Sequence, residues 1–300
     1  MDLKLSIFTN AGTVPLEIAK RHGFFADEGL TVEIEGTTSS IIQMTGVIDG
    51  RYDIAASAID NVIAYNSGRG AAHTKVASNL KVFLGSASYR LPFVVGAHIK
   101  TFSDLQGSTI AVDALNTGFA FLLREMLEIN GLSQDRYQFT SVGAPKERWE
   151  AVQNGDATGA LLNGHFEAIA HQAGCHTLVS SPDPWDTYEG NVFCAGPDFL
   201  ASEYADAFAK AVLRGVNFAK NPENINAVAL ALAQHLGGLD QATALKVARS
   251  LQGPKSIIMD GLPVSRSGIE TVLRLREKYT GKRLGLTPDS LCDPRVLFVP

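Results

Sequence analysis

The stretch from Asn10 to Gly36 constrains the fold most, because it places a loop, a helix, a turn and a strand directly after an opening strand, Leu3–Thr9. Its apolar residues recur at helical spacing, and Pro15 falls in the first helical turn, where a missing N–H has no consequence. Gly23 is expected to end the helix, and Thr31–Glu35 alternates as a half-buried strand does. A strand, a helix and a further strand in this order predict a parallel α/β sheet.

The loop before the first helix is the first candidate binding element. Asn10, Gly12 and Thr13 follow the end of the opening strand, and Thr13 is the predicted N-cap of the helix. The first N–H groups of a helix have no partner within the helix, so they attract anions. The sequence therefore predicts that this loop contacts an acidic ligand.

The alternation of strands and helices continues to about residue 180 and starts afresh after the segment 88–92. The expected strands are Tyr52–Ala58, Lys81–Ser86, Phe93–Ala97, Thr109–Asp113, Tyr137–Val142, Thr158–Leu162 and His176–Val179. A turn-rich, acidic segment at 181–190 precedes a last strand, Asn191–Ala195. After it the sequence predicts almost only helices, over Ala201–Ala219, Pro222–Leu236, Asp240–Leu251 and Arg266–Tyr279.

Composition excludes several function classes. The net charge of −5, without a basic run, argues against nucleic acid, whose phosphates need clustered Lys and Arg. No apolar run reaches the roughly 20 residues that span a bilayer. The cysteines and histidines lack metal-ligand spacing, and the glycine-rich phosphate and dinucleotide motifs and the nucleophile elbow are missing. We expect no metal and no cofactor.

Four motifs resemble the substrate-binding proteins of ABC importers, specifically the nitrate, sulfonate and taurine binders and their thiamine-pyrimidine relatives. They are Gly23-Phe-Phe-x-x-Glu-Gly-Leu-x-Val-Glu33, Asp49-Gly-x-Tyr-Asp-Ile-Ala55, Ser103-Asp-Leu-Gln-Gly107, and Pro197-x-Phe-Leu200 with Asn221-Pro222. The resemblance implies an α/β fold of the type II periplasmic-binding-protein kind, with two lobes that each hold a mixed, mostly parallel sheet flanked by helices. It also implies a helical C-terminal tail packed on the first lobe. The first lobe would comprise 1–88 and 191–300, the second 89–190, with crossovers near 88–92 and 181–191.

Ligands of open α/β sheets bind beyond the carboxyl ends of the strands, and the resemblance implies the same place, a cleft between the lobes. The candidate ligand-binding residues are Asn10, Gly12, Thr13, Thr38, Ser39, Ser57, Asp60, Arg90, Asn116, Thr117, Gly118, Asn163 and His165. Most are small or hydroxyl-bearing residues at expected helix starts. Asp60 is interpreted first as a helix cap, and a ligand amine is its alternative partner. Arg90 can grip a carboxylate or sulfonate with two parallel hydrogen bonds.

The leading hypothesis is a monomeric binding protein that captures a small organic anion, such as a sulfonate or carboxylate, for an ABC permease. One alternative is a cytoplasmic enzyme on the same fold, acting on an aromatic acid or a pyrimidine-like substrate, with His165, Arg90 and Asp60 as the residues to test. A metabolite sensor is the second alternative. No signal peptide is apparent, so the expected location is periplasmic or extracytoplasmic if an export signal has been removed, and cytoplasmic otherwise.

Overall fold

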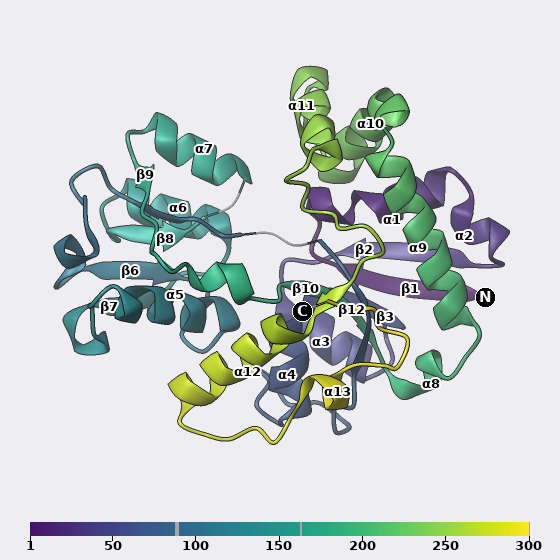
Figure 1. Cartoon of the computed structure of the whole chain (residues 1–300), viewed down its shortest axis with the longest axis horizontal. Coiled ribbons are helices and arrows are strands. Elements are labelled where there is room, and N and C mark those ends of the chain that lie inside the picture. The colour runs from purple at the N-terminus through teal and green to yellow at the C-terminus, as the bar shows by residue number, and fades with distance from the viewer. Residues whose placement is uncertain (88–89, 163, 300) are drawn as a thin grey trace. The chain divides into compact units, whose positions relative to one another are not determined.

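The computed structural model describes residues 1–87, 90–162 and 164–299, with the backbone alone at 164 and 165. The chain divides into two compact units (Figure 1). Unit 1 comprises Met1–Tyr89, Glu189–Glu270 and Gly285–Pro300, and unit 2 comprises Arg90–Tyr188 and Thr271–Leu284. Each unit is built around its own five-stranded sheet.

The sheet of unit 1 has the strand order β2-β1-β3-β10-β4. β1 (Asp2–Ile7) pairs in parallel with β2 (Thr31–Gly36) on one side and with β3 (Ile54–Ala58) on the other. β10 (Asn191–Ala195) runs antiparallel between β3 and β4 (Lys81–Gly85). The predicted strands are therefore present, and the sheet is mixed because β10 returns to it after a long excursion of the chain.

Helices cover both faces of this sheet. α1 (Val14–Arg21) and the short α2 (Phe24–Asp27) connect β1 to β2, and α3 (Ser40–Ile48) connects β2 to β3. The connection from β1 to β2 and the connection from β2 across to β3 run in opposite directions along the sheet. Right-handed crossovers therefore place α1 and α3 on opposite faces. α4 (Ile59–Asn66) follows β3.

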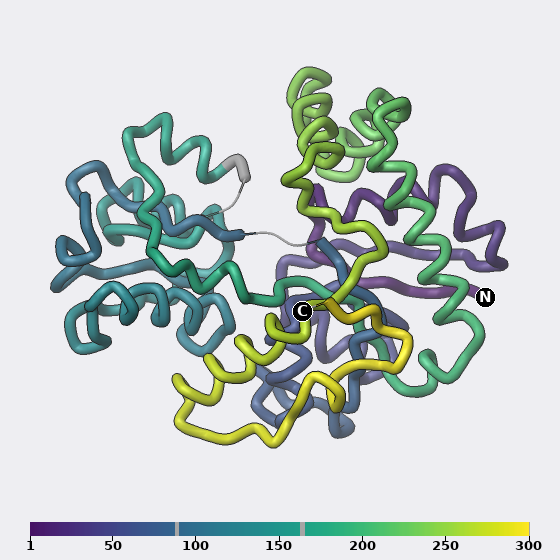
Figure 2. The backbone as a smooth tube through the Cα atoms, in the orientation of Figure 1, coloured from purple at the N-terminus to yellow at the C-terminus, as the bar shows by residue number. Residues whose placement is uncertain are grey.

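The helical tail after β10 packs on the first helix. It contains α8 (Pro197–Leu200), α9 (Tyr204–Lys220), η5 (Pro222–Asn224), α10 (Ile225–Leu236) and α11 (Gln241–Gln252). α9 and α10 both contact α1, and Figure 2 shows their green trace beside its purple one. A Cβ atom at Gly215 would lie 2.3 Å from the carbonyl oxygen of Pro15, so a glycine is required where α9 crosses α1. Beyond the tail, β11 (Val264–Ser265) pairs with β12 (Phe298–Val299), and α13 (Pro288–Leu291) lies between them in sequence.

Unit 2 repeats the arrangement of unit 1, with the strand order β7-β6-β8-β5-β9. The three parallel strands are β6 (Thr109–Val112), β7 (Gln138–Ser141) and β8 (Gly159–Leu161), and β5 (Phe93–Val95) runs antiparallel between β8 and β9 (His176–Thr177). The helices of this unit are α5 (Gly118–Ile129), α6 (Pro145–Gln153) and α7 (Gly164–Gln172), with short 3-10 turns η2 (Phe102–Leu105), η3 (Gln134–Arg136) and η4 (Pro184–Thr187).

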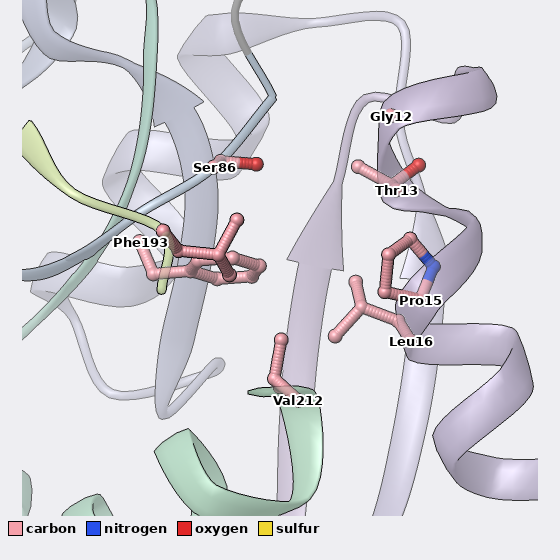
Figure 3. Close-up of a pocket in the computed structure, with 8 residues that line it drawn as sticks. Gly12, Thr13, Pro15, Leu16, Ser86, Phe193 and Val212 are labelled. Carbon is pink, nitrogen blue, oxygen red and sulfur yellow. The ribbon is translucent and has the colours of Figure 1, made fainter. Parts of the chain in front are cut away.

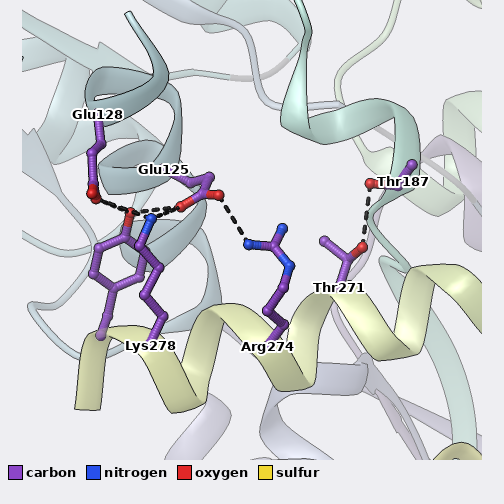
Figure 4. Close-up of polar contacts among 7 residues, drawn as sticks. Glu125, Glu128, Thr187, Thr271, Arg274 and Lys278 are labelled. Atoms are coloured by element: carbon purple, nitrogen blue, oxygen red, sulfur yellow. Dashed lines mark hydrogen bonds and ion pairs between the residues drawn. The ribbon is translucent and has the colours of Figure 1, made fainter. Parts of the chain in front are cut away.

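The last long helix, α12 (Arg266–Thr280), differs from the sequence expectation, which groups it with the first lobe. From Thr271 onward it belongs to unit 2. The physical reason is Glu125 of α5, whose carboxylate accepts hydrogen bonds from Lys278 Nζ at 2.6 Å, Tyr279 Oη at 2.8 Å and Arg274 NH1 at 3.0 Å (Figure 4). Because these partners are about 150 positions apart in the sequence, no local sequence pattern predicts that α12 packs on α5.

Glu125 is buried, with 8% of the residue exposed, and the ionisation of its carboxyl depends on these bonds. Burial alone would raise its pKa, but the hydrogen bonds from Lys278, Tyr279 and Arg274 outweigh burial and lower the pKa below its ordinary value. In the same cluster burial and the two glutamates raise the pKa of Tyr279. The cluster is thus charged at neutral pH and fastens α12 to α5.

We expect Glu125→Gln to lower the free energy of unfolding of unit 2 by roughly 2 kcal/mol, because charge-assisted bonds to a buried acceptor are lost. Glu128→Gln is the matched control, since Glu128 accepts from the same Tyr279 at 2.9 Å but its side chain is 42% exposed. Its effect should stay within about 0.5 kcal/mol. Urea unfolding, with amide hydrogen exchange in α5 as the probe of unit 2, measures both variants. Equal losses of unfolding free energy in Glu125→Gln and Glu128→Gln would contradict this account.

Candidate functional site

The register of unit 1 brings several candidate loops to one edge of its sheet. Ile7 at the end of β1 lies opposite Gly36 of β2 and Ala56 of β3, and Ala58 lies opposite Asn191 at the start of β10. The loops after β1, β2 and β3 therefore leave the sheet at the same edge. This is where open α/β sheets bind ligands.

The loop from Asn10 to Thr13 satisfies most of its hydrogen bonds by itself. The Asn10 side chain accepts from Gly12 N at 2.8 Å and donates to Phe8 O at 2.9 Å. Thr13 N donates to Asn10 O at 3.1 Å, and Val14 N donates to Ala11 O. The prediction that this helix start offers free N–H groups is therefore wrong in its details, because a turn of 3-10 helix, η1 (Ala11–Thr13), uses them.

Thr13 precedes α1 as predicted, but its hydroxyl does not cap that helix. The hydroxyl accepts from Asn10 N at 3.2 Å, lies 2.9 Å from Asn10 O and contacts His235 Nε2 of α10 at 2.8 Å. Thr13 is buried, so its side chain acts inside the fold.

Gly12 is fixed by packing. A Cβ atom at this position would lie 2.0 Å from Cβ of Ala87, far inside van der Waals contact. A cavity of about 10 Å³ below the loop is lined by Thr13, Ser86 and Phe193 among others (Figure 3). That volume holds about one water molecule, so it is not a ligand pocket.

The start of α3, at the edge described above, has open backbone donors. Ser39 is its N-cap, and the Ser39 hydroxyl accepts from Ile42 N at 3.3 Å. Within the part of the chain that the structure describes, the N–H groups of Ser40 and Ile41 and the hydroxyl of Thr38 have no hydrogen-bond partner. These donors lie at the end of β2, at the edge described above, and Thr38 is exposed.

Ser57 and Asp60 lie at the same edge, but both side chains interact within the start of α4. Ser57 is fully buried, and its hydroxyl accepts from Asn61 Nδ2 at 3.0 Å. The interpretation of Asp60 as a cap is wrong, because Ala58 is the N-cap of α4 and Asp60 lies inside its first turn. There its negative charge interacts favourably with the helix dipole.

Glu189 is a residue of this edge that the sequence analysis missed. It precedes Gly190, whose carbonyl accepts from Ile59 N at the start of α4. Its own carboxyl accepts from Ser265 N at 2.7 Å. Burial raises the pKa of Glu189 to about 7 despite that bond. Nothing in the local sequence, a turn-rich acidic segment, distinguishes this glutamate from its neighbours.

In unit 2 the carboxyl end of β6 carries a cluster around Asp113. Thr117 is the N-cap of α5, where its hydroxyl accepts from Ala120 N at 3.2 Å and donates to Asp113 Oδ1 at 2.8 Å. Burial raises the pKa of Asp113, and the buried guanidinium of Arg148 opposes that shift. Gly118 begins α5, while Asn116 is exposed and its carbonyl accepts from Arg276. Asp113 and Arg148 were not among the predicted residues.

The remaining candidates of unit 2 are placed less favourably for binding an anion. Arg90 pairs with the carboxylate of Asp183 and lies 4.0 Å from that of Asp186, so its charge is largely compensated. Asn163 lies outside the described residues. His165 lies in α7, and its side chain is outside the description.

Across residues 1–87, 90–162 and 164–299, no group of three His, Cys, Asp or Glu residues is arranged to hold a metal ion. No helix in this described part is both long and apolar enough to cross a membrane.

Comparison with known families places the chain. The family described as NMT1/THI5 like matches residues 10–225, more than half of the sequence, and the chain belongs to this family. The family resemblance seen in the motifs is thereby confirmed. None of the curated proteins matches the chain.

Solved structures share its fold at low identity. The periplasmic aliphatic sulphonate-binding protein SsuA from Escherichia coli is 15% identical, with 100% of this chain and 94% of that one covered and a TM-score of 0.70. The alkanesulfonate-binding protein SsuA from Xanthomonas axonopodis pv. citri, bound to MOPS, is 14% identical over 99% and 98%, with a TM-score of 0.68. The ligand-binding component of an ABC-type import system from Staphylococcus aureus, with zinc bound, is 13% identical over 98% and 97%, with a TM-score of 0.73. The predicted two-lobed α/β fold class is confirmed.

The contact of Gly12 with Ala87 generates a stability test. We expect Gly12→Ala to destabilise unit 1 by about 1–3 kcal/mol, because the added methyl group overpacks the interior. The double variant Gly12→Ala with Ala87→Gly removes the opposing Cβ atom and should recover at least half of that loss. Urea unfolding of the wild type, the two single variants Gly12→Ala and Ala87→Gly, and the double variant measures the coupling energy between the two positions. Strictly additive changes in the free energy of unfolding would show that the two side chains do not contact each other.

Glu189 generates a pH test. Its folded-state pKa of about 7 lies above the unfolded value near 4.5, so the folded protein binds this proton more tightly. The contribution of Glu189 to the free energy of unfolding is fully present below pH 4.5 and is lost as the pH rises through 7. Unfolding free energies between pH 5 and 8 should therefore decline less in Glu189→Gln than in the wild type. Glu203→Gln, at an exposed residue, should keep the wild-type slope, and an unchanged slope in Glu189→Gln would refute the assignment.

Proposed function

We propose that this protein is the substrate-binding component of an ABC-type import system and that its ligand is a small organic anion, a sulfonate or a carboxylate. The fold supports the proposal, since both SsuA proteins are described as sulfonate binders and match nearly the whole chain. In this role the protein delivers its ligand to a membrane permease on the outer side of the cytoplasmic membrane. Binding rather than turnover is the proposed activity.

The start of α3 carries the anion preference. It supplies the open N–H groups of Ser40 and Ile41 at the positive end of a helix dipole, next to the exposed hydroxyl of Thr38. An oxyanion of a sulfonate or carboxylate can accept several such bonds at once. The exposed side chains of Ile41 and Ile42 offer apolar surface beside these donors. That combination suits an acid with a carbon skeleton better than a bare inorganic ion.

A small anion bound by helix-start donors does not need a full cationic partner. Arg90 is held by Asp183, and the carboxyls near the predicted residues include Asp60, Asp113 and Glu189. A cation-rich site would bind anions strongly and without discrimination, whereas hydrogen bonds from N–H and O–H groups depend on geometry. The proposal is therefore a site that selects by shape and hydrogen bonding. Asn163 and His165 remain proposed ligand contacts.

A thermal-shift screen tests the function. Sulfonates, carboxylates, nitrate, aromatic acids, pyrimidines and amines are added to the purified protein. A true anionic ligand at 100 times its Kd should add about 2.7 kcal/mol, which corresponds to roughly 5 °C in Tm. Stabilisation by amines alone would overturn the anion preference. Chemical conversion of the stabilising compound during incubation would replace binding by catalysis.

A charge introduced at the start of α3 tests the site itself. Ser40→Glu should weaken an anionic ligand at least tenfold, because the new carboxylate competes for the same N–H groups, while the helix itself gains stability from its dipole. Gln241→Glu is the matched control, since Gln241 is the first residue of α11 in the same unit. Isothermal titration with the best compound of the screen compares the two. Equal losses in both variants would exclude the start of α3 from the site.

A further inference from the structure

A histidine of the helical tail reaches the first candidate loop. His235 is near the end of α10, which packs on α1, and its Nε2 atom lies 2.8 Å from the hydroxyl oxygen of Thr13. The two residues are 222 positions apart in the chain. This contact therefore ties the tail of unit 1 to the loop after β1.

Hydrogen-bond accounting fixes the direction of the contact. The Thr13 hydroxyl has one proton, and it lies 2.9 Å from Asn10 O and 2.8 Å from His235 Nε2. If the ring carries its proton on Nε2, the ring donates to Thr13, Thr13 donates to Asn10 O, and Asn10 N donates to Thr13 at 3.2 Å. With a bare Nε2 the single hydroxyl proton would go to the ring, and Asn10 O would keep only its bond from Thr13 N at 3.1 Å, so the Nε2–H form makes one more hydrogen bond. The Nε2–H tautomer is therefore assigned.

The ring is neutral at pH 7. Burial lowers the pKa of His235, and the carboxylate of Glu17 on α1 and the backbone of Asn10 act in the opposite direction. Glu17 is itself paired with Arg21 at 2.6 Å, which weakens its influence on the ring. Protonation adds a proton at Nδ1 and leaves the Nε2 donor in place, so the contact is a fixed structural bond across the neutral range.

We propose that His235 is a positioning residue of the binding site, in that its Nε2–H holds Thr13 and thereby fixes the conformation of the Asn10–Thr13 loop, which leaves the sheet at the same edge as the start of α3. The role in binding rests on the proposed function; the role in the loop does not. Thr13 sits at the centre of the loop's hydrogen bonds, with Asn10 N and Asn10 O both bound to its hydroxyl. Without His235 the hydroxyl would keep only its contacts with Asn10, and the turn would lose its bond to the rest of unit 1.

Amide hydrogen exchange and histidine NMR test the loop part without any ligand. The ¹⁵N shifts of His235 should show the proton on Nε2. In His235→Leu the amides of Gly12 and Thr13 should exchange about tenfold faster than in the wild type, as the loss of one net hydrogen bond predicts. His235→Gln, which keeps an N–H donor, should restore slow exchange. His171→Leu is the control, because His171 also contacts a threonine, Thr177 at 3.0 Å, but in unit 2.

Two results would overturn the proposed role of His235 in the loop. One is unchanged exchange in His235→Leu, and the other is faster exchange spread evenly over all of unit 1, which would indicate general destabilisation.

The proposed role of His235 in binding is tested with MOPS, the sulfonate found in a related structure. His235→Leu should raise its Kd at least threefold and His235→Gln should not. Equal Kd values with a loosened loop would overturn the positioning role, whereas failure of every sulfonate and carboxylate to bind the wild type would overturn the proposed function and leave the loop result standing.

Discussion

The central constraint in this structure is the position of β1 between β2 and β3 in a parallel arrangement. Because both neighbours pair with β1 in parallel, all three strands end at one edge, and the polar residues that follow them gather there. Because the neighbours lie on opposite sides, the connecting helices cover the two faces of the sheet, and the loops between strands and helices lie at this edge. Unit 2 satisfies the same constraint with β6 between β7 and β8.

This constraint explains why much of the fold could be predicted from the sequence. Hydrophobic periodicity and glycine stops are local signals, and each strand–helix unit can be read within about thirty residues. The strand Asn191–Ala195 has the predicted bounds. The position of α12 could not be predicted, because it depends on a buried carboxylate at Glu125 that is distant in sequence. Periodicity shows that a helix has an apolar face, but not which surface covers it.

The location of the candidate site could be predicted from the sequence, but which hydrogen-bond donors are open to a ligand could not. The loops at the sheet edge follow from topology, whereas the use of each donor depends on competition between a ligand and the loop itself. Asn10 and Thr13 are good hydrogen-bonding residues, and for that reason a short turn recruits them internally. At the start of α3 the Ser39 hydroxyl accepts only from Ile42 N, and among the described residues no other group takes up the N–H groups of Ser40 and Ile41. Sequence patterns identify polar residues at helix starts without distinguishing these two outcomes.

The same competition gives the C-terminal half of the chain a role in the site. The Thr13 hydroxyl of the loop after β1 already bonds to Asn10 N and Asn10 O, and α10 supplies a third partner through His235. The close crossing of α9 over α1, at Gly215 and Pro15, brings the tail near enough for this contact. An insertion or a bulky residue at that crossing would therefore shift α10 relative to the loop, even though it touches neither His235 nor Thr13. The first loop thus keeps its own hydrogen bonds and gains one contact from a residue 222 positions away in sequence, which the packing of α9 and α10 on α1 brings within reach.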